Sequence, residues 1–448
     1  MRIVIAGDYP ENPPNLVGGI QAVLYNTLQR LGAYGDLDVH VVTCEKWRSR
    51  PLDRPQTSEI VVSTSLAGLP AACPAEYGNP RSAAERDRTP DGDCGSSRRH
   101  ALSAVEVQAR RAQAVARPGR WTVHYLPSSP RIPHTLSMLT VDRWAVRRQI
   151  QALAPDLIHA HGQAVAYPFA AFDTGLPTVV TVHGINMLEA KVDPRGGTLR
   201  GRLRIALWGW VERRCLGRAR DIVVISPFVE QVISPYTRAH LHVVENPVHD
   251  AFFHLEPEPQ PGKVLMVGSI QKRKGVLEAI QAMQVVRQKV PHAELYVAGG
   301  FSPAYQVYGD LVKRYVTETG AAEYVHFSGH LGHQGLLEAY RTSQVFLFPT
   351  FLEASPVALA EAMSAGLPSV VSRIGGTEHL INDGLSGYRV PAGDIDALAE
   401  STIRLLGDPL TCQRFGQRAR EIAKTRFSAE LAARKTHDLY LAVAGSRL

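Results

Sequence analysis

The sequence V-F-L-F-P-T-F-L-E-A-S-P-V-A-L-A-E-A-M-S-A-G-L-P-S-V-V-S-R-I-G-G occupies residues 345–376 and decides the fold. Its apolar run 345–348 ends at a proline and predicts a buried strand. Ser355 then stands at the expected N-cap of a helix and Pro356 at its first position. The run 367–371 predicts the next strand. A strand–helix–strand unit of this kind belongs to an open α/β sheet, and its helix start attracts anions.

Two carboxylates frame that helix start. Glu353 precedes the helix, and Glu361 lies on it, about 7.5 Å along the axis from Pro356. A carboxylate accepts hydrogen bonds from two neighbouring hydroxyls, so the pair suits a nucleotide-sugar. The alternative is a solvated loop acid and an ordinary helix glutamate, and the spacing alone does not separate the two.

Glu353, Glu361 and the following Gly-Leu-Pro turn resemble the E-x7-E signature of retaining GT-B glycosyltransferases (glycosyltransferase family 4-like, group 1). The resemblance covers most of residues 1–44 and 121–440. It implies an α/β protein with the GT-B fold, two facing Rossmann-like doubly wound domains with an interdomain cleft. It also implies transfer of a sugar from a UDP- or GDP-linked donor, with Glu353 on the sugar and Glu361 on the ribose.

The domain boundaries follow from changes in composition. We expect an N-terminal acceptor-side domain over 1–246, a proline-rich linker over 247–262, a C-terminal donor-binding domain over 263–427, and a final helix over 428–448 that crosses back to the first domain.

The N-terminal domain contains a basic insertion near 48–120. Residues 81–120 include nine arginines, five acids and no lysine. Such a segment has too little apolar surface to offset the entropy of ordering. We therefore predict a largely mobile, solvated insert, helical at most over 101–115.

Gly18 and Gly19 stand before a predicted helix at 20–31, in the loop after the first strand. That loop is too long for the dinucleotide turn, which disfavours a nicotinamide cofactor. The resemblance implies that the two glycines lie beside the donor phosphates, as do Ser355, Pro356 and Val357. A plain flexible turn is the alternative for the glycines.

Lys272, Arg273 and Lys274 crowd the end of a strand and the start of the next helix. Cations at a helix start are unfavourable unless an anion neutralises them, which indicates a diphosphate site rather than a solvated basic turn. The resemblance assigns the catalytic cations to Arg273 and Lys274. Because these cations supply positive charge, we expect no metal and no cofactor.

Three histidines stand at predicted strand ends, where open α/β sheets bind ligands. The resemblance implies that His183 lies near the transferred sugar and is a catalytic residue. For His159 and His161, packing or hydrogen bonding to the backbone is at least as good an interpretation.

The segment 198–216 predicts a basic helix with Leu199, Leu203, Leu207 and Trp210 at helical spacing. A membrane-surface helix and a core-facing helix both have this pattern. We favour the core-facing interpretation, because a buried strand follows and needs a cover.

Composition limits the class of protein. The 448 residues carry a net charge of +7 with a pI near 9.2, which fits weak attraction to anionic lipid or phosphorylated substrates. No known nucleic-acid module is present, so we predict no nucleic-acid partner. Five cysteines without a C-x-x-C pair indicate a reducing compartment. Lacking a signal peptide or an apolar membrane span, the sequence predicts a cytoplasmic protein, with peripheral contact at the inner face of the membrane left open.

The predicted activity is transfer to a small-molecule, glycan or lipid-linked acceptor. Two alternatives remain: a GT-B epimerase or phosphorylase using the same donor cleft, and a non-catalytic nucleotide-sugar-binding protein. The intact pair Glu353 and Glu361 argues against the second.

Overall fold

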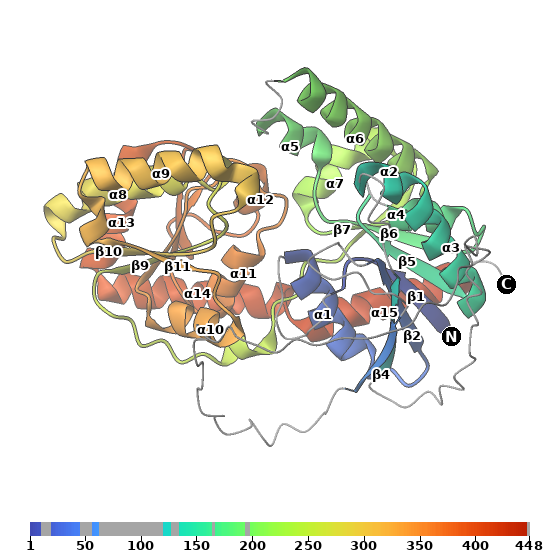
Figure 1. Ribbon diagram of the computed structural model, residues 1–448. Coiled ribbons are helices and arrows are strands. Elements are labelled where there is room, and N and C mark those ends of the chain that lie inside the picture. Colours follow the sequence, from blue (N-terminus) through green and yellow to red (C-terminus); the bar gives the residue numbers. More distant parts are fainter. Residues whose placement is uncertain are drawn as a thin grey trace, which may run out of the picture. The chain divides into compact units, whose positions relative to one another are not determined.

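The computed structural model describes residues 1–9, 19–44, 56–61, 120–126, 134–163, 166–192 and 198–445 (Figure 1). The described strands form two separate sheets, each with helices on both faces. The predicted α/β doubly wound class is therefore confirmed.

The first sheet has the strand order β3-β4-β2-β1-β5-β6-β7-β8 among the described residues. Its strands are β1 Arg2–Ala6, β2 Asp38–Cys44, β3 Gln56–Val61, β4 Arg120–Leu126, β5 Leu157–His161, β6 Thr178–Val182, β7 Asp221–Val224 and β8 His240–Val243. All neighbours are parallel except β3 and β4. The strand order reverses between β1 and β5, so ligands are expected at the carboxyl ends of these strands.

The second sheet is parallel throughout, with the order β11-β10-β9-β12-β13-β14. Its strands are β9 Lys263–Val267, β10 Glu294–Ala298, β11 Val325–Gly329, β12 Val345–Phe348, β13 Ser369–Ser372 and β14 Gly387–Val390. Here the order reverses between β9 and β12. Their carboxyl ends therefore meet at the point where doubly wound sheets bind ligands.

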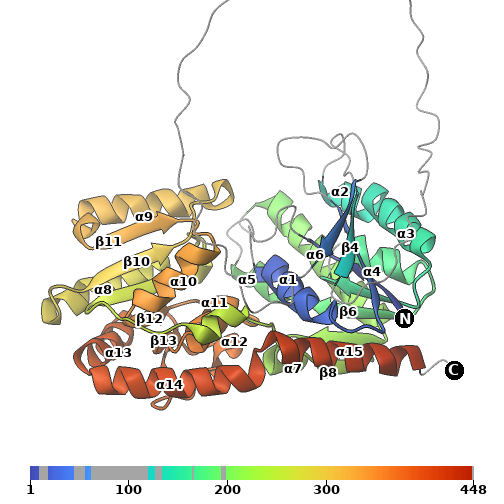
Figure 2. The same cartoon turned by 90° about the horizontal axis from the view of Figure 1, so that it is seen from below.

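Helices cover both faces of the first sheet. They are α1 Gly19–Leu31, α2 His134–Leu139, α3 Val141–Leu153, α4 Ala166–Phe172, α5 Asn186–Val192, α6 Leu199–Arg218, α7 Pro227–Ile233 and the last helix, α15 Ala429–Gly445. Side chains of α1 and α15 share one apolar core with β1 and β2, and Figure 2 shows these two helices close together. The opposite face is covered by α3, α4 and α6.

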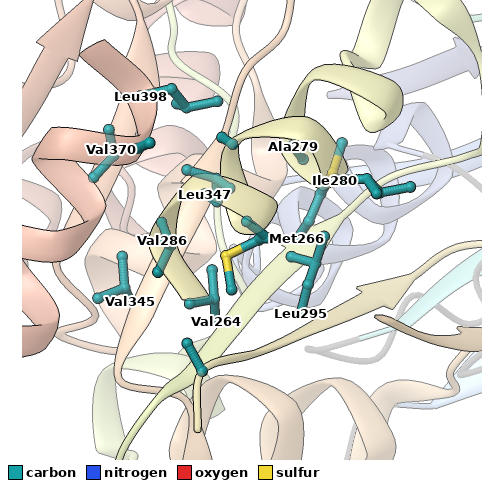
Figure 3. Packing of buried hydrophobic residues seen from close by; sticks show 14 of the residues in the cluster. Val264, Met266, Ala279, Ile280, Val286, Leu295, Val345, Leu347, Val370 and Leu398 are labelled. Atoms are coloured by element: carbon teal, nitrogen blue, oxygen red, sulfur yellow. The ribbon is translucent and has the colours of Figure 1, made fainter. Parts of the chain in front are cut away.

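The second sheet has one core on each face. Its helices are α8 Val276–Lys289, α9 Gln306–Glu318, α10 His333–Thr342, α11 Val357–Ser364, α12 Gly375–Glu378, α13 Ile395–Gly407 and α14 Pro409–Arg426. Val264 and Met266 of β9 face α8, α9 and α13 (Figure 3). Leu265, between them, faces α10, α11 and α14. This alternation is the two-residue period of a strand covered on both faces.

The short connections include single turns of 3-10 helix. They are η2 Ser234–Tyr236, η3 Asp250–His254, η4 Lys272–Lys274, η5 Pro303–Tyr305 and η6 Ala321–Glu323.

The predicted start of α11 is wrong by one position. The N-cap is Pro356, not Ser355, and the helix begins at Val357. Pro356 has an extended backbone, with φ −74° and ψ 108°, so it cannot be the first helical residue. No side chain caps this helix.

The preferred interpretation of the helix over 198–216 is confirmed only in part: α6 covers the core, but not through the predicted row of apolar residues. The side chains of Leu199, Leu203 and Trp210 on α6 are exposed, and do not face the core. The sheet is covered instead by the opposite side of the helix, through Val211 and Cys215. Spacing shows that residues share a face of a helix but not which face is covered.

The insert near 48–120 contains a strand that the sequence analysis missed. Residues 56–61 form β3, which pairs antiparallel with β4 at the edge of the first sheet. The rest of the insert lies outside the described residues, which exclude 45–55 and 62–119. The predicted mobility and the predicted helix over 101–115 fall in these segments.

None of the helices in the described ranges combines the length and the apolar composition needed to cross a bilayer.

Candidate active site

The loop after β9 carries Arg273 and Lys274, and the loop after β12 carries Glu353; the three charged side chains are in contact. Arg273 Nη1 lies 3.0 Å from Glu353 Oε1, and Lys274 Nζ lies 2.5 Å from the same oxygen. Thr350 Oγ1 also lies 3.3 Å from this oxygen. β9 and β12 are parallel neighbours, so the loops that leave their carboxyl ends start side by side. Strand order therefore joins residues that lie about eighty positions apart.

Backbone contacts fix the two loops to each other. The Arg273 carbonyl accepts hydrogen bonds from the Phe351 amide, at 2.8 Å, and from Thr350 Oγ1, at 2.9 Å. Gly275 has a φ of +71°, and a Cβ there would lie 2.0 Å from the Pro349 carbonyl oxygen. Only glycine allows this close approach, which ends the η4 turn and lets α8 begin at Val276.

Glu353 is a buried, ionised carboxylate. Burial by itself would raise its pKa, but Lys274 and Arg273 outweigh burial and lower the pKa below its ordinary value. The negative charge therefore stays on Glu353 and occupies both cations when no donor is bound.

Glu361 lies on α11 and has an unusual acidity. Burial raises its pKa from 4.5 to about 7, and a hydrogen bond from Tyr340 lowers it only in part. Tyr340 Oη, on the buried side of α10, donates to Glu361 Oε2 at 3.1 Å and also lies 2.9 Å from the Ala358 carbonyl. Glu361 is thus half protonated near neutral pH.

Three histidines, His159, His161 and His183, form a row of neighbouring side chains. His183 Nε2 lies 2.8 Å from His161 Nδ1, and the centroid of the His161 ring lies 4.4 Å from that of His159, with the two rings tilted by 34°. His159 in turn contacts Thr181 Oγ1 at 2.6 Å and Tyr440 Oη at 2.7 Å. Burial lowers the pKa of His183 to about 4 and that of His159 to about 3. Both are neutral at physiological pH.

A cavity of about 160 Å³ lies between the part of the chain that forms the first sheet, here called the first half, and the part that forms the second sheet, the second half. The first half contributes His183, Ile185, Leu188, Glu189 and Phe228 to its wall. The second half contributes Arg273, Leu352, Glu353, Ala354 and Ser355. Ser226 Oγ donates to the Ala354 carbonyl at 2.7 Å, and this bond connects the first half directly to the Glu353 loop.

The structure thus brings His183, Arg273, Glu353 and Ser355 to one cavity, with Lys274 bound to Glu353 beside it. Pro356 and Val357 form the start of α11, and Glu361 lies further along that helix. Gly19 opens α1, whereas Gly18 lies outside the described residues.

Tyr340, Thr350 and Glu189 contribute to the site but were absent from the sequence analysis. Tyr340 comes from α10, twenty-one positions before its partner Glu361, and no motif links the two. Thr350 had a usable signal, since it follows the predicted strand at its carboxyl end.

A larger cavity, of about 620 Å³, lies elsewhere in the second half. Residues that line it include Pro261, Gln344 and Pro368, which precede β9, β12 and β13. It therefore opens at the amino ends of the strands, the edge that parallel sheets do not use for their main ligand site.

No cluster of three or more potential metal ligands occurs among the described residues.

Comparisons with known proteins define the class. The family model for glycosyl transferases group 1 matches residues 249–422, and the model for Glycosyltransferase Family 4 matches residues 97–252. Glycogen synthase of Mycobacterium tuberculosis (strain ATCC 25618 / H37Rv) is 27% identical over 296 residues, which cover 64% of this chain and 69% of the relative.

Two solved structures share the fold over nearly their whole length. Sucrose-phosphate synthase from Thermosynechococcus elongatus superimposes with a TM-score of 0.70 and 19% identity, over 99% of both chains. HepE from Anabaena, solved in complex with UDP-glucose, superimposes with a TM-score of 0.66 and 16% identity, over 99% of this chain and 100% of HepE.

Fold and matches together define a glycosyltransferase with the GT-B fold. The chain belongs to the group 1 glycosyltransferases, as its resemblance to that group predicted.

Proposed function

We propose that this protein is a retaining glycosyltransferase that moves a sugar from a nucleoside diphosphate sugar to an acceptor hydroxyl. The observation that carries the proposal is the shared contact of Arg273 and Lys274 with Glu353 Oε1, in a cavity whose opposite wall contains His183.

The two cations are proposed to bind the donor diphosphate. A diphosphate offers them stronger, bidentate partners than one carboxylate oxygen, so donor binding exchanges one anion for another. The first amide groups of α11 have no acceptor within the helix and point to the same region, where they favour negative charge.

Glu353, once released by the cations, is proposed to accept hydrogen bonds from the sugar hydroxyls. His183 lines the same cavity and is neutral. It therefore binds a sugar hydroxyl without adding a charge that would compete for the diphosphate. The cavity of about 160 Å³ is smaller than an ordinary ligand pocket of about 300–1,000 Å³. We assign it to the sugar and the adjoining phosphate only.

Glu361 is proposed to bind the ribose hydroxyls. Tyr340 orients its Oε2, whereas no side chain of the described ranges donates to its Oε1. Ribose hydroxyls donate best to the ionised form, so donor binding is coupled to loss of the Glu361 proton.

In the proposed chemical step, the bond from the anomeric carbon to the diphosphate oxygen breaks. The acceptor oxygen forms the new bond on the same face of the sugar, and its proton passes to the leaving phosphate. The protein stabilises the charge that develops on the diphosphate, through Arg273 and Lys274, without a metal ion.

A thermal-shift panel of UDP- and GDP-sugars tests donor binding. A ligand at a hundred times its dissociation constant stabilises the protein by about 2.7 kcal/mol. We expect one base to give a clear rise in Tm and the other to give little. Proton NMR of the glycosylated product then shows whether the anomeric configuration of the donor sugar is kept. An inverted product, or no shift with any nucleotide-sugar, would contradict the proposal.

Metal independence has its own test. Turnover measured with excess EDTA should equal turnover with added Mg²⁺. Activity that disappears with EDTA and returns with Mg²⁺ or Mn²⁺ would show that the two cations do not replace a metal.

A further inference from the structure

The outward face of α6 is an apolar surface with a basic end. We define the α6 surface as Leu199, Leu203, Leu207 and Trp210 with Arg213, Arg214 and Arg218. The four apolar side chains are 75%, 64%, 36% and 59% exposed. Monomeric proteins seldom expose four large apolar side chains in one continuous row, so this surface calls for a partner.

The helix is held firmly in this orientation. Its inner face buries Val211, Cys215 and Leu216 completely or nearly so against the first sheet. Glu212, fully buried, accepts hydrogen bonds from the amides of Asn186 and Met187, both at 2.9 Å. Turning the leucines inward would remove Glu212 from these donors and leave a buried charge unpaired.

Charge identifies the chemistry of the partner. Glu212 is the acidic residue of α6, and it faces the interior. The outward face is basic instead: Arg213 and Arg214 are exposed, and Arg214 lies over the Trp210 ring at 5.6 Å. A row of leucines with an adjacent tryptophan and arginines matches a helix that lies in the interface of an anionic bilayer. In the sequence, residues 81–120 carry nine arginines and five acids, so this segment offers the basic α6 surface no excess of negative charge.

We propose that the α6 surface binds an anionic lipid surface and thereby holds the cleft next to the membrane. α5 packs beside α6 and contributes Leu188 and Glu189 to the cavity wall (Figure 1). The helix that carries the α6 surface thus packs against a helix that lines the cavity. Resting on the proposed function, this placement makes a lipid-linked sugar or lipid headgroup the class of acceptor.

Vesicle sedimentation of the whole chain, without donor, tests the proposal. We expect binding to vesicles of phosphatidylcholine with 30% phosphatidylglycerol, and at least tenfold weaker binding to phosphatidylcholine alone or at high salt. Leu203→Glu should weaken binding to the anionic vesicles at least tenfold, because it removes an exposed leucine that would enter the lipid and adds a negative charge. The matched control is Leu410→Glu, since Leu410 on α14 is also highly exposed, at 78%, and should leave binding unchanged.

Three outcomes would overturn the proposal. They are absence of binding by the wild type, equal binding by Leu203→Glu and wild type, and a stable wild-type dimer that Leu203→Glu dissociates while vesicles have no effect. Thermal unfolding of both variants checks that they are folded. The comparison of neutral and anionic vesicles uses the wild type alone and does not depend on the variants. Vesicle binding is measured without donor. Its result can therefore be interpreted even if the proposed transferase activity is not found.

Discussion

Tyr340 Oη donates to Glu361 Oε2 across 3.1 Å and holds a carboxyl whose pKa is about 7 on the helix that starts at the proposed phosphate site. The hydrogen bond orients the carboxyl, but it offsets only part of the rise in pKa that burial causes. Glu361 is therefore the group of the proposed donor site whose charge changes most near neutral pH.

This acidity predicts a stability effect with a defined sign. Between pH 4.5 and about 7 the folded protein holds a proton on Glu361 that the unfolded chain has released, so the free energy of unfolding falls as pH rises through this window. The loss amounts to about 3 kcal/mol at most. Glu361→Gln should therefore be more stable than wild type at pH 8 and about equal to it at pH 4.5.

Urea unfolding of both proteins at the two pH values measures the difference. Glu400→Gln, at an exposed position of α13, is the control and should differ from wild type at neither pH. A constant difference between Glu361→Gln and wild type would show that the pKa of Glu361 is not raised.

The same proton couples to ligand binding. The affinity for nucleoside diphosphate should fall as pH drops below 7, because the ribose needs the ionised carboxylate, by up to about tenfold per pH unit. Titration calorimetry at several pH values measures the slope. Glu361→Gln should bind more weakly at pH 8 and lose the part of the slope that Glu361 causes. An identical slope in both proteins would assign it to the phosphate alone.

Neighbouring lysines provide a matched pair. Lys274→Ala should weaken nucleoside diphosphate binding by about 1.5–3 kcal/mol, since it removes a charged hydrogen-bond donor. Lys272, two positions earlier, is exposed and is not one of the cations paired with Glu353, so Lys272→Ala should leave the affinity within about twofold. Equal effects of both substitutions would mean that only the general positive field matters.

Glu353→Gln should separate binding from turnover. Without the Glu353 charge, Arg273 and Lys274 have no competing anion, so the affinity for nucleoside diphosphate should stay equal or increase. Turnover should fall about 100-fold or more, because the proposed sugar contact is lost. Calorimetry with the sugar-free diphosphate and a product assay measure the two quantities. Weaker diphosphate binding in this variant would contradict the exchange of anions.

Gly376 sets the position of the Glu353 loop. A Cβ at Gly376 would lie 2.2 Å from the Glu353 carbonyl oxygen, whereas a Cβ at Gly407 would meet open space. Gly376→Ala should lower the free energy of unfolding by about 1–3 kcal/mol and reduce turnover, because the loop must move. Gly407→Ala should change neither. Wild-type turnover in folded Gly376→Ala would show that the loop tolerates the shift.

The strands of the second sheet were predictable because strands covered on both faces are continuous apolar runs, as in 345–348. The meeting of Arg273 with Glu353 could be anticipated only through the family pattern, since their distance depends on strand order and not on spacing. The proton on Glu361 depends on how completely α10 and α11 enclose it, and no spacing in the sequence reports that enclosure. The outward leucines of α6 were misassigned for a related reason, because periodicity does not tell which side of a helix the sheet will occupy.

The row of histidines ends on Tyr440, in the last helix of the described chain. The ring of His159 is bonded at one nitrogen to Tyr440 and at the other to Thr181, and its neighbour His161 holds His183 at the cavity. A residue within the final ten positions of the sequence is thereby part of the wall behind the proposed sugar site. A premature stop codon that spares every residue of the cleft but removes α15 would thus disturb the cleft from behind, as a lesion in the catalytic machinery rather than the loss of a tail.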